Sequence, residues 1–337
     1  MRLRRSDPDG PGIRRRVRGK GFSYTDIDGS PMSRTRILAR IERLVIPPAW
    51  RAVWICPHPN GHIQAVGTDA AGRRQYLYHE QWRRERDEEK FDRVLELATR
   101  LPRVRERVAA DLGRAGLGRH RVEAVAIGLI DRGVFRVGSE EYAEENGTRG
   151  AATLLREQTR VHGEQISFDY VAKGSVRRQV TICDALLARA VRALRRVRAG
   201  SPRLLVYRHA GEYRELRADD INSRFKELAG TECSAKDLRT WQATVQAAEA
   251  FARHDPPATA AARKRLEREV VADVAATLGN TPAVARASYI DPRVIRCFTE
   301  GVTIAAGAAR AAKLRDPDER RRVLDREVVR LLRRARR

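Results

Sequence analysis

The spacing of apolar residues changes near residue 90, and this change constrains the fold more than any other feature of the sequence. Before it, short runs alternate between apolar and polar residues and are separated by glycine turns, as at residues 72–79. Such alternation is typical of strands that bury one face. After it, apolar residues recur at helical spacing, as at Leu101, Val104 and Val108, which is typical of amphipathic helices.

These patterns predict an α+β fold in two domains. Residues 1–90 are expected to form a small antiparallel β-sheet domain, in which residues 1–21, rich in Arg, Gly and Pro, form a mobile arm. Residues 91–337 are expected to form a larger, mainly α-helical domain with a short three-stranded sheet. The three strands of that sheet are expected at residues 152–155, 165–171 and 178–182.

The charge of the chain points to a polyanionic partner. Lys and Arg number 68 against 44 Asp and Glu, which gives a formal net charge of +24. The basic residues are spread from Arg2 to Arg337 rather than gathered in one tail. Nucleic acid is the commonest partner of such a protein. A GC-rich coding bias and attraction to anionic membranes are the alternatives that charge alone leaves open.

Several classes of protein are disfavoured by what the sequence lacks. No apolar run approaches the roughly 20 residues that span a bilayer, and the basic N-terminus lacks the apolar stretch of a signal peptide. A cytoplasmic, nucleoid-associated protein is therefore expected. The four cysteines lie far apart without a CxxC pair, which argues against a zinc site and a disulfide framework. Neither a Walker loop for a nucleotide nor a carboxylate cluster for Mg²⁺ stands out.

An enzyme that acts on a phosphodiester without a metal needs fixed cations, a nucleophile and an acid. Two stretches offer cations. Arg136 ends an apolar helix predicted over residues 122–137, where a guanidinium can be held firmly; taken alone, a charge pair with Glu140 is the more ordinary explanation. Lys173 lies at the tip of a predicted hairpin, where most lysines are simply solvated.

Two further stretches offer a second arginine and a tyrosine. Lys236-Asp237-Leu238-Arg239-Thr240 lies at a helix N-terminus, where the helix dipole and free amides favour a phosphate. Gly279-Asn280-Thr281-Pro282 precedes Tyr289. Taken alone, Arg239 is an ordinary helix arginine and Tyr289 a half-buried core tyrosine.

Together, the four stretches occur in the order of a known family. They resemble the catalytic domain of type IB DNA topoisomerases, especially the small poxvirus-like and bacterial forms, which shares its fold and active site with tyrosine recombinases. In the N-terminal part, Ile46-Pro47-Pro48-Ala49-Trp50 and Gly72-Arg73-Arg74-Gln75-Tyr76-Leu77-Tyr78 are similar to the topoisomerase β-domain. The resemblance spans roughly residues 20–300.

The resemblance implies an enzyme that relaxes supercoiled double-stranded DNA. Tyr289 would attack the scissile phosphodiester, giving a 3′-phosphotyrosyl link and a free 5′-hydroxyl. Arg136 and Arg239 would bind the non-bridging oxygens, and Lys173 would protonate the departing 5′ oxygen. Strand rotation and religation would follow without ATP, metal or another cofactor. A monomer that surrounds the duplex as a C-shaped clamp is expected.

One catalytic position departs from the family, and several DNA contacts are expected beside the catalytic residues. Asn280 occupies a position at which the family usually has histidine, so we expect it to act by donating a hydrogen bond rather than a proton. Lys236 is expected to bind DNA at its helix N-terminus. In the β-domain, the segment that contacts DNA in relatives is matched by Arg73, Arg74, Tyr76 and Tyr78.

Two rival interpretations remain. A site-specific tyrosine recombinase would share the nucleophile, the arginines and the hairpin lysine, although recombinases usually carry a helical N-terminal domain, unlike the β-rich start of this chain. Alternatively, a non-catalytic protein that coats DNA would use only the basic charge. Such a protein would form no covalent adduct. For Tyr76 and Tyr78, the alternative to a DNA contact is that the pair simply packs on the sheet.

Overall fold

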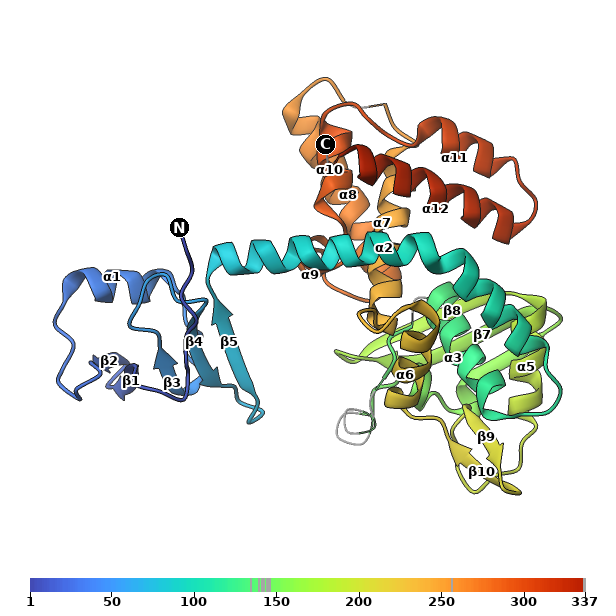
Figure 1. Ribbon diagram of the computed structural model, residues 1–337, viewed down its shortest axis with the longest axis horizontal. Helices are drawn as coiled ribbons and strands as arrows, with labels where there is room; N and C mark the ends of the chain where they lie inside the picture. Colours follow the sequence, from blue (N-terminus) through green and yellow to red (C-terminus); the bar gives the residue numbers. More distant parts are fainter. Residues whose placement is uncertain (134, 139, 141–142, 144–146, 256, 336–337) are drawn as a thin grey trace. The chain divides into compact units, whose positions relative to one another are not determined.

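The computed structural model describes residues 1–133, 135–138, 140, 143, 147–255 and 257–335. The chain divides into two compact units, Met1–Lys90 and Phe91–Arg337. The first is built on an antiparallel sheet and the second is mostly helical (Figure 1). The predicted α+β class is therefore confirmed. Within the described part of the chain, no helix combines the length and the apolar character needed to cross a membrane.

The smaller unit is built on a five-stranded sheet in the order β2-β1-β3-β4-β5. Its strands are β1 (Ile13–Arg18), β2 (Gly21–Thr25), β3 (Arg51–Ile55), β4 (Ile63–Thr68) and β5 (Arg74–Tyr78). On one face, Ile41 of the helix α1 (Thr35–Arg43) packs with Val53 and Ile55. Alternation along β3 directs Trp54 to the opposite face, where its Nε1 donates to the carbonyl of Gly10 at 3.2 Å.

The N-terminal segment packs against this sheet, so the prediction of a mobile arm over residues 1–21 is wrong. Strand β1 pairs with both β2 and β3. Upstream of it, the backbone N–H of Ser6 donates to Nδ1 of His62 at 2.8 Å. The sequence pattern conceals β1 because its second apolar residue, Val17, is 79% exposed. Backbone pairing with two neighbouring strands holds this strand instead of a buried apolar face.

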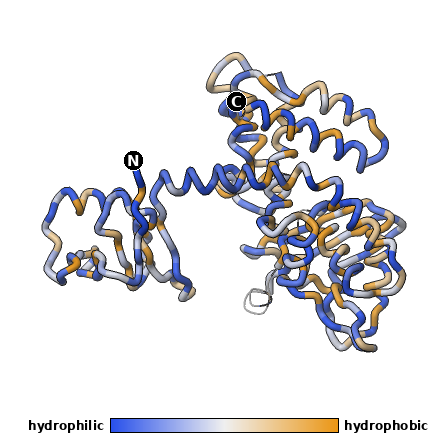
Figure 2. The backbone as a smooth tube through the Cα atoms, viewed as in Figure 1, coloured by the Kyte–Doolittle hydropathy of each residue, from blue (hydrophilic) through white to orange (hydrophobic). Residues whose placement is uncertain are grey.

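The larger unit consists mainly of helices. It includes α2 (Glu80–Gly113, whose first turns belong to the smaller unit), α3 (Arg119–Gly133), α5 (Ala185–Arg195), α6 (Ala218–Ala229), α7 (Ala235–Phe251), α8 (Ala260–Leu278), α9 (Pro282–Ser288), α10 (Pro292–Thr299), α11 (Ala305–Ala312) and α12 (Pro317–Arg334). The first turns of α2 are strongly hydrophilic (Figure 2). By contrast, α3 is buried along almost its whole length, so it forms the centre of this unit.

A three-stranded antiparallel sheet lies in the larger unit, as predicted, but its first strand is elsewhere. The strands are β6 (Thr159–His162), β7 (Gln165–Ala172) and β8 (Val176–Cys183), and a separate hairpin is formed by β9 (Val206–His209) and β10 (Glu212–Glu215). Residues 152–155, predicted as a strand, do not form one. A short 3₁₀ turn covers Ala151–Thr153, and a second 3₁₀ turn follows at Arg156–Gln158. The Ala152 N–H donates to the Val137 carbonyl at 2.8 Å, so this backbone pairs with the chain after α3.

The helix predicted over residues 122–137 also ends earlier than expected. It stops at Gly133, because the ring of Phe135 folds back over the helix end. A Cβ atom at Gly133 would lie only 2.4 Å from that ring. Phe135 itself is fully buried, and its position is therefore decided by the core rather than by helix periodicity.

Buried charges anchor the C-terminal helix α12 to the centre of the unit. Asp325 accepts hydrogen bonds from Nε1 of Trp241 at 2.7 Å and from Arg105 at 2.5 Å. Asp131 of α3 accepts from Nε of Arg105 at 3.0 Å and from Arg321 at 2.6 Å. These five residues, which we call the α12 network, connect α12 with α2, α3 and α7.

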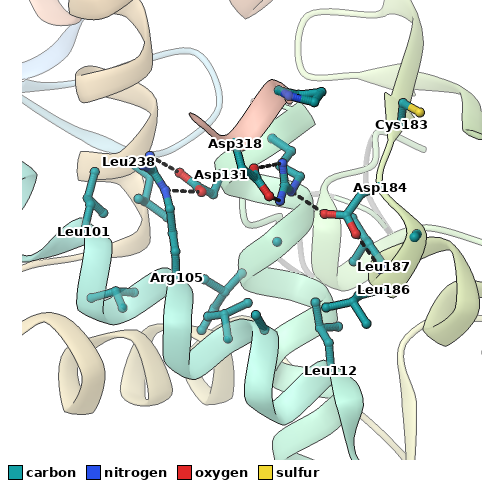
Figure 3. A pocket seen from close by; sticks show the side chains of 18 of the residues that line it. Leu101, Arg105, Leu112, Asp131, Cys183, Asp184, Leu186, Leu187, Leu238 and Asp318 are labelled. Carbon is teal, nitrogen blue, oxygen red and sulfur yellow. Dashed lines mark hydrogen bonds and ion pairs between the residues drawn. The ribbon is translucent and has the colours of Figure 1, made fainter. Parts of the chain in front are cut away.

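A pocket of about 370 Å³ lies beside this network (Figure 3). Leucines of α2 and α5, including Leu101, Leu112 and Leu187, line much of it. Next to them, Arg132 bridges Asp184 at 2.5 Å and Asp318 at 2.7 Å. The lining includes none of the ten residues predicted to act in catalysis or DNA binding. This pocket is therefore distinct from the candidate active site.

Candidate active site

Arg136 lies in an irregular segment just after α3, not at the end of a helix as predicted. The preceding residue, Phe135, anchors the segment: its ring stacks on Tyr170 with centroids 5.3 Å apart and meets Phe168 edge-on at 5.0 Å. Held in this way, Nη2 of Arg136 donates to the carbonyl of Gly279 at 3.1 Å and to Oδ1 of Asn280. Burial of a neighbouring aromatic ring thus fixes the place of the guanidinium.

Asn280 follows the C-terminal turn of α8. That turn needs Gly279, whose φ of 62° lies in the left-handed region that glycine adopts readily. Because Arg136 can only donate hydrogen bonds, its contact identifies the accepting atom as Oδ1 and orients the amide. The amide nitrogen Nδ2 is then buried without a hydrogen-bond acceptor among the residues that the structure describes. A donor is therefore available to an incoming oxygen.

Arg239 lies in the first turns of α7. The helix begins as predicted: the Asp237 carboxylate accepts from the backbone N–H of Ser234 at 2.8 Å and from its hydroxyl at 3.0 Å. Arg239 is only 2% exposed, and its Nη2 donates to the carbonyl of Leu278 at 2.9 Å. Burial lowers the pKa of Arg239 to about 10, and the positive charge of Arg136 contributes to this shift. The guanidinium therefore remains protonated at neutral pH.

Tyr289 lies directly beside Arg239. It follows α9, a helix capped by Thr281, whose hydroxyl accepts from the Val284 N–H at 3.4 Å. The Tyr289 side chain is buried, with the Arg239 guanidinium carbon 5.6 Å from the ring centroid. A hydrogen bond between these two side chains raises the pKa of Arg239 against the effect of burial. From α7, the Thr244 hydroxyl donates to the backbone carbonyl of Tyr289 at 3.3 Å.

Four of the five predicted catalytic residues therefore meet at the C-terminal end of α8: Arg136, Arg239, Asn280 and Tyr289. The fifth, Lys173, is exposed at the tip between β7 and β8. Close to this tip, the buried side chain of Tyr170 lies near the cluster, since the charges of Arg239 and Arg136 oppose the rise that burial causes in its pKa. The predicted DNA-binding residue Lys236 is exposed on the first turn of α7.

Sequence reasoning missed one arginine of this cluster. Arg178 on β8 lies opposite Tyr170 in the sheet, and its Nη2 donates to the carbonyl of Thr277 at 2.6 Å. A signal was available, since alternation along β8 places Arg178 on the same face as the apolar residues Val180 and Ile182. A cation on the inward face of a strand indicates a specific partner.

In the smaller unit, the residues predicted to contact DNA gather on and beside the edge strand β5. Tyr76 and Tyr78 lie on one face, 38% and 40% exposed, with ring centroids 5.9 Å apart. Neither ring is buried within the sheet. Arg74 lies over the Tyr76 ring at 5.7 Å and pairs with Asp9 at 2.8 Å, while Arg73 pairs with Asp69 at 2.8 Å.

Comparisons with known proteins agree with this arrangement. Residues 79–302 match the family described as eukaryotic DNA topoisomerase I, catalytic core, and residues 21–69 match the bacterial DNA topoisomerase IB N-terminal domain. The chain is 28% identical over 287 residues to a DNA topoisomerase 1B of Acanthamoeba polyphaga mimivirus, covering 83% of this chain and 85% of that relative. The catalytic-core match covers more than half of the chain, so the chain belongs to the type IB DNA topoisomerase family.

Proposed function

We propose that the protein relaxes supercoiled double-stranded DNA by cutting one strand through a covalent bond to Tyr289 and then resealing it. The observation that carries this proposal is the burial of Tyr289 against Arg239 in a cluster that also contains Arg136 and Asn280. A phenolic nucleophile beside two guanidiniums suits attack on phosphorus, because the cations can stabilise the charge that develops there.

The reaction is a reversible transesterification. The Tyr289 hydroxyl gives its proton to solvent water and its oxygen attacks phosphorus, while the bond from phosphorus to the 5′ oxygen breaks. Lys173 supplies a proton to that leaving oxygen, because a lysine ammonium group can act as a general acid. The 5′-hydroxyl later attacks the 3′-phosphotyrosine and releases Tyr289. Because one phosphoester bond replaces another at each step, no ATP needs to be consumed.

Torsional strain in the DNA drives rotation of the cut strand before resealing. The same proposal includes that a single copy of the chain is sufficient. The net charge of +24 supports the proposed action on DNA, since a basic protein binds duplex DNA largely through phosphate contacts.

The test is relaxation of a supercoiled plasmid by the purified protein in EDTA and without ATP. We expect complete relaxation and a protein–DNA adduct that survives denaturant. Recombinant joints without relaxation would instead favour a tyrosine recombinase. If neither relaxation nor an adduct is observed, the result would fit only a protein that coats DNA, and it would contradict the proposal.

Asn280 is proposed to donate a hydrogen bond from Nδ2 to a non-bridging phosphate oxygen. Its buried nitrogen, which lacks an acceptor among the described residues, supports this role. Asn280→Ala is expected to slow single-turnover cleavage by about 10- to 100-fold, the value of a hydrogen bond to a charged group. Asn280→His keeps a donor and should retain activity.

Asn280→Asp provides the matched control for this role. It retains an acceptor for Arg136 but cannot donate when ionised, so it should be at least as slow as the alanine variant. Cleavage by Asn280→Ala at the wild-type rate would remove Asn280 from the active site.

Tyr76 and Tyr78 are proposed to bind the DNA backbone through their hydroxyl groups, beside Arg73 and Arg74. Replacing either tyrosine by phenylalanine removes only a hydroxyl and is expected to weaken duplex binding by about 1 kcal/mol. Fluorescence anisotropy with a labelled duplex measures this loss. Tyr213 on β10, also 40% exposed, is the control: if its phenylalanine variant loses as much affinity, the contact is not specific to β5.

A further inference from the structure

Three arginines bind three consecutive carbonyl groups at the end of α8. Arg178 donates to Thr277 at 2.6 Å, Arg239 to Leu278 at 2.9 Å and Arg136 to Gly279 at 3.1 Å. They come from β8, α7 and the segment after α3, so no local sequence pattern links them. Carbonyls at a helix C-terminus lack intrahelical partners and form the negative end of the helix dipole. This helix end is therefore suited to hold cations.

We propose that Arg178 is a positioning residue of the active site, which holds the Gly279–Asn280 turn and thereby places Asn280 and Arg136. The inference rests on the proposed function, because it concerns the same reaction. It adds a residue that the four sequence motifs do not contain.

The packing of Arg178 on the turn supports this role. A Cβ atom built on Gly279 would lie 3.0 Å from Nη1 and 3.2 Å from Cδ of Arg178, so the arginine side chain lies directly against the glycine. The next residue, Asn280, is held by its own N–H, which donates to the Ala275 carbonyl at 2.9 Å. On its other side, its Oδ1 receives the bond from Arg136. Loss of Arg178 would free one side of the turn.

Electrostatics also connects Arg178 with the cluster. Burial lowers the pKa of Arg178; the neighbouring Tyr170 opposes this shift and the charge of Arg136 adds to it. The guanidiniums thus repel one another, and the carbonyls of α8 offset part of that repulsion. A group of cations held in place before the substrate arrives needs little reorganisation when negative charge develops on phosphorus.

The test measures single-turnover cleavage of a suicide duplex by Arg178→Ala. We expect cleavage to slow by about 10- to 100-fold, because a charged hydrogen bond within the site is lost. Arg178→Lys can still donate to the Thr277 carbonyl and should recover part of the rate. The matched control is Arg177→Ala on the same strand: it removes the same charge, but Arg177 is exposed and pairs with Asp169 at 2.6 Å. It should cleave within about twofold of the wild type.

A double variant separates positioning from a merely structural role. If Arg178 acts through the turn that carries Asn280, then Arg178→Ala combined with Asn280→Ala should cleave within about threefold of the slower single variant. The proposal would be overturned if the rate loss of the double variant equalled the product of the two single losses. It would also be overturned if Arg178→Ala cleaved as fast as Arg177→Ala. If the alanine variant does not fold, judged by its circular dichroism, Arg178→Lys carries the same double-variant comparison.

Failure of the proposed function is distinguishable from failure of this inference. A wild-type protein that forms no adduct would overturn both. An adduct that forms at the same rate in the wild type and in folded Arg178→Ala would overturn the inference alone.

Discussion

Tyr289→Phe is expected to abolish both the covalent adduct and plasmid relaxation, with a loss of rate on the order of 10⁴-fold or more, as for other removed nucleophiles. The expected cause is purely chemical. Phenylalanine keeps the ring, which is only 9% exposed and faces Arg239 at 5.6 Å, and loses only the attacking oxygen. Duplex affinity should therefore remain close to the wild-type value, and stability should fall only by the hydrogen bond lost to Arg239, about 1–2 kcal/mol. Denaturing gel electrophoresis of protein mixed with labelled duplex measures the adduct.

A second buried tyrosine provides the control for this experiment. Tyr207 on β9 is 8% exposed and lies outside the cluster at the end of α8. Tyr207→Phe should form the adduct at the wild-type rate. If Tyr289→Phe also formed it at that rate, the nucleophile would have to be another residue and the mechanism proposed for Tyr289 would fail.

Asp325→Ala is expected to destabilise the larger unit by about 3–5 kcal/mol, the usual result of removing one partner from a buried charge network. Asp325 is 7% exposed and accepts from both Arg105 and Trp241; the substitution leaves both donors without this acceptor. For a unit of this size, the loss corresponds to roughly 6–20 °C in Tm. Thermal unfolding followed by circular dichroism measures it.

Activity should fall with stability in the Asp325 variant. Asp131 lies five residues before Arg136 and Trp241 two residues after Arg239, so the α12 network supports both segments that carry the arginines proposed to act in catalysis. The control is Glu319→Ala, on the exposed first turn of the same helix, which should change stability by less than about 1 kcal/mol. Equal losses in the two variants would show that the network contributes little.

The α12 network also predicts a dependence on pH. Burial raises the pKa of Asp131, but the charges of Arg105 and Arg321 outweigh it and bring the pKa to about 2. An unfolded aspartate titrates near 3.9. The stabilisation from Asp131 should therefore be complete above pH 4 and disappear as the pH falls through 2. The Tm difference between wild type and Asp131→Asn, which lacks the titrating carboxyl group, should narrow over that range.

The amino-acid sequence by itself determined the fold class and several helix ends. Thr281 before Pro282 and Asp291 before Pro292 cap α9 and α10, and the sequence alone indicates such caps because a cap depends on residues only a few positions apart. The order of Arg136, Arg239, Asn280 and Tyr289 likewise indicated the family before any contact was known.

Tertiary structure alone decided the features that depend on distant partners. Strand β1 exists because two neighbouring strands bind its backbone, although its side chains are mostly exposed. The end of α3 is set by the ring of Phe135 packing into the core. Arg178 reaches the cluster at the end of α8 because strand pairing turns it toward the carbonyl of Thr277, 99 residues later in the chain. Periodicity and capping describe neighbours in sequence, whereas each of these contacts forms only when the chain has folded.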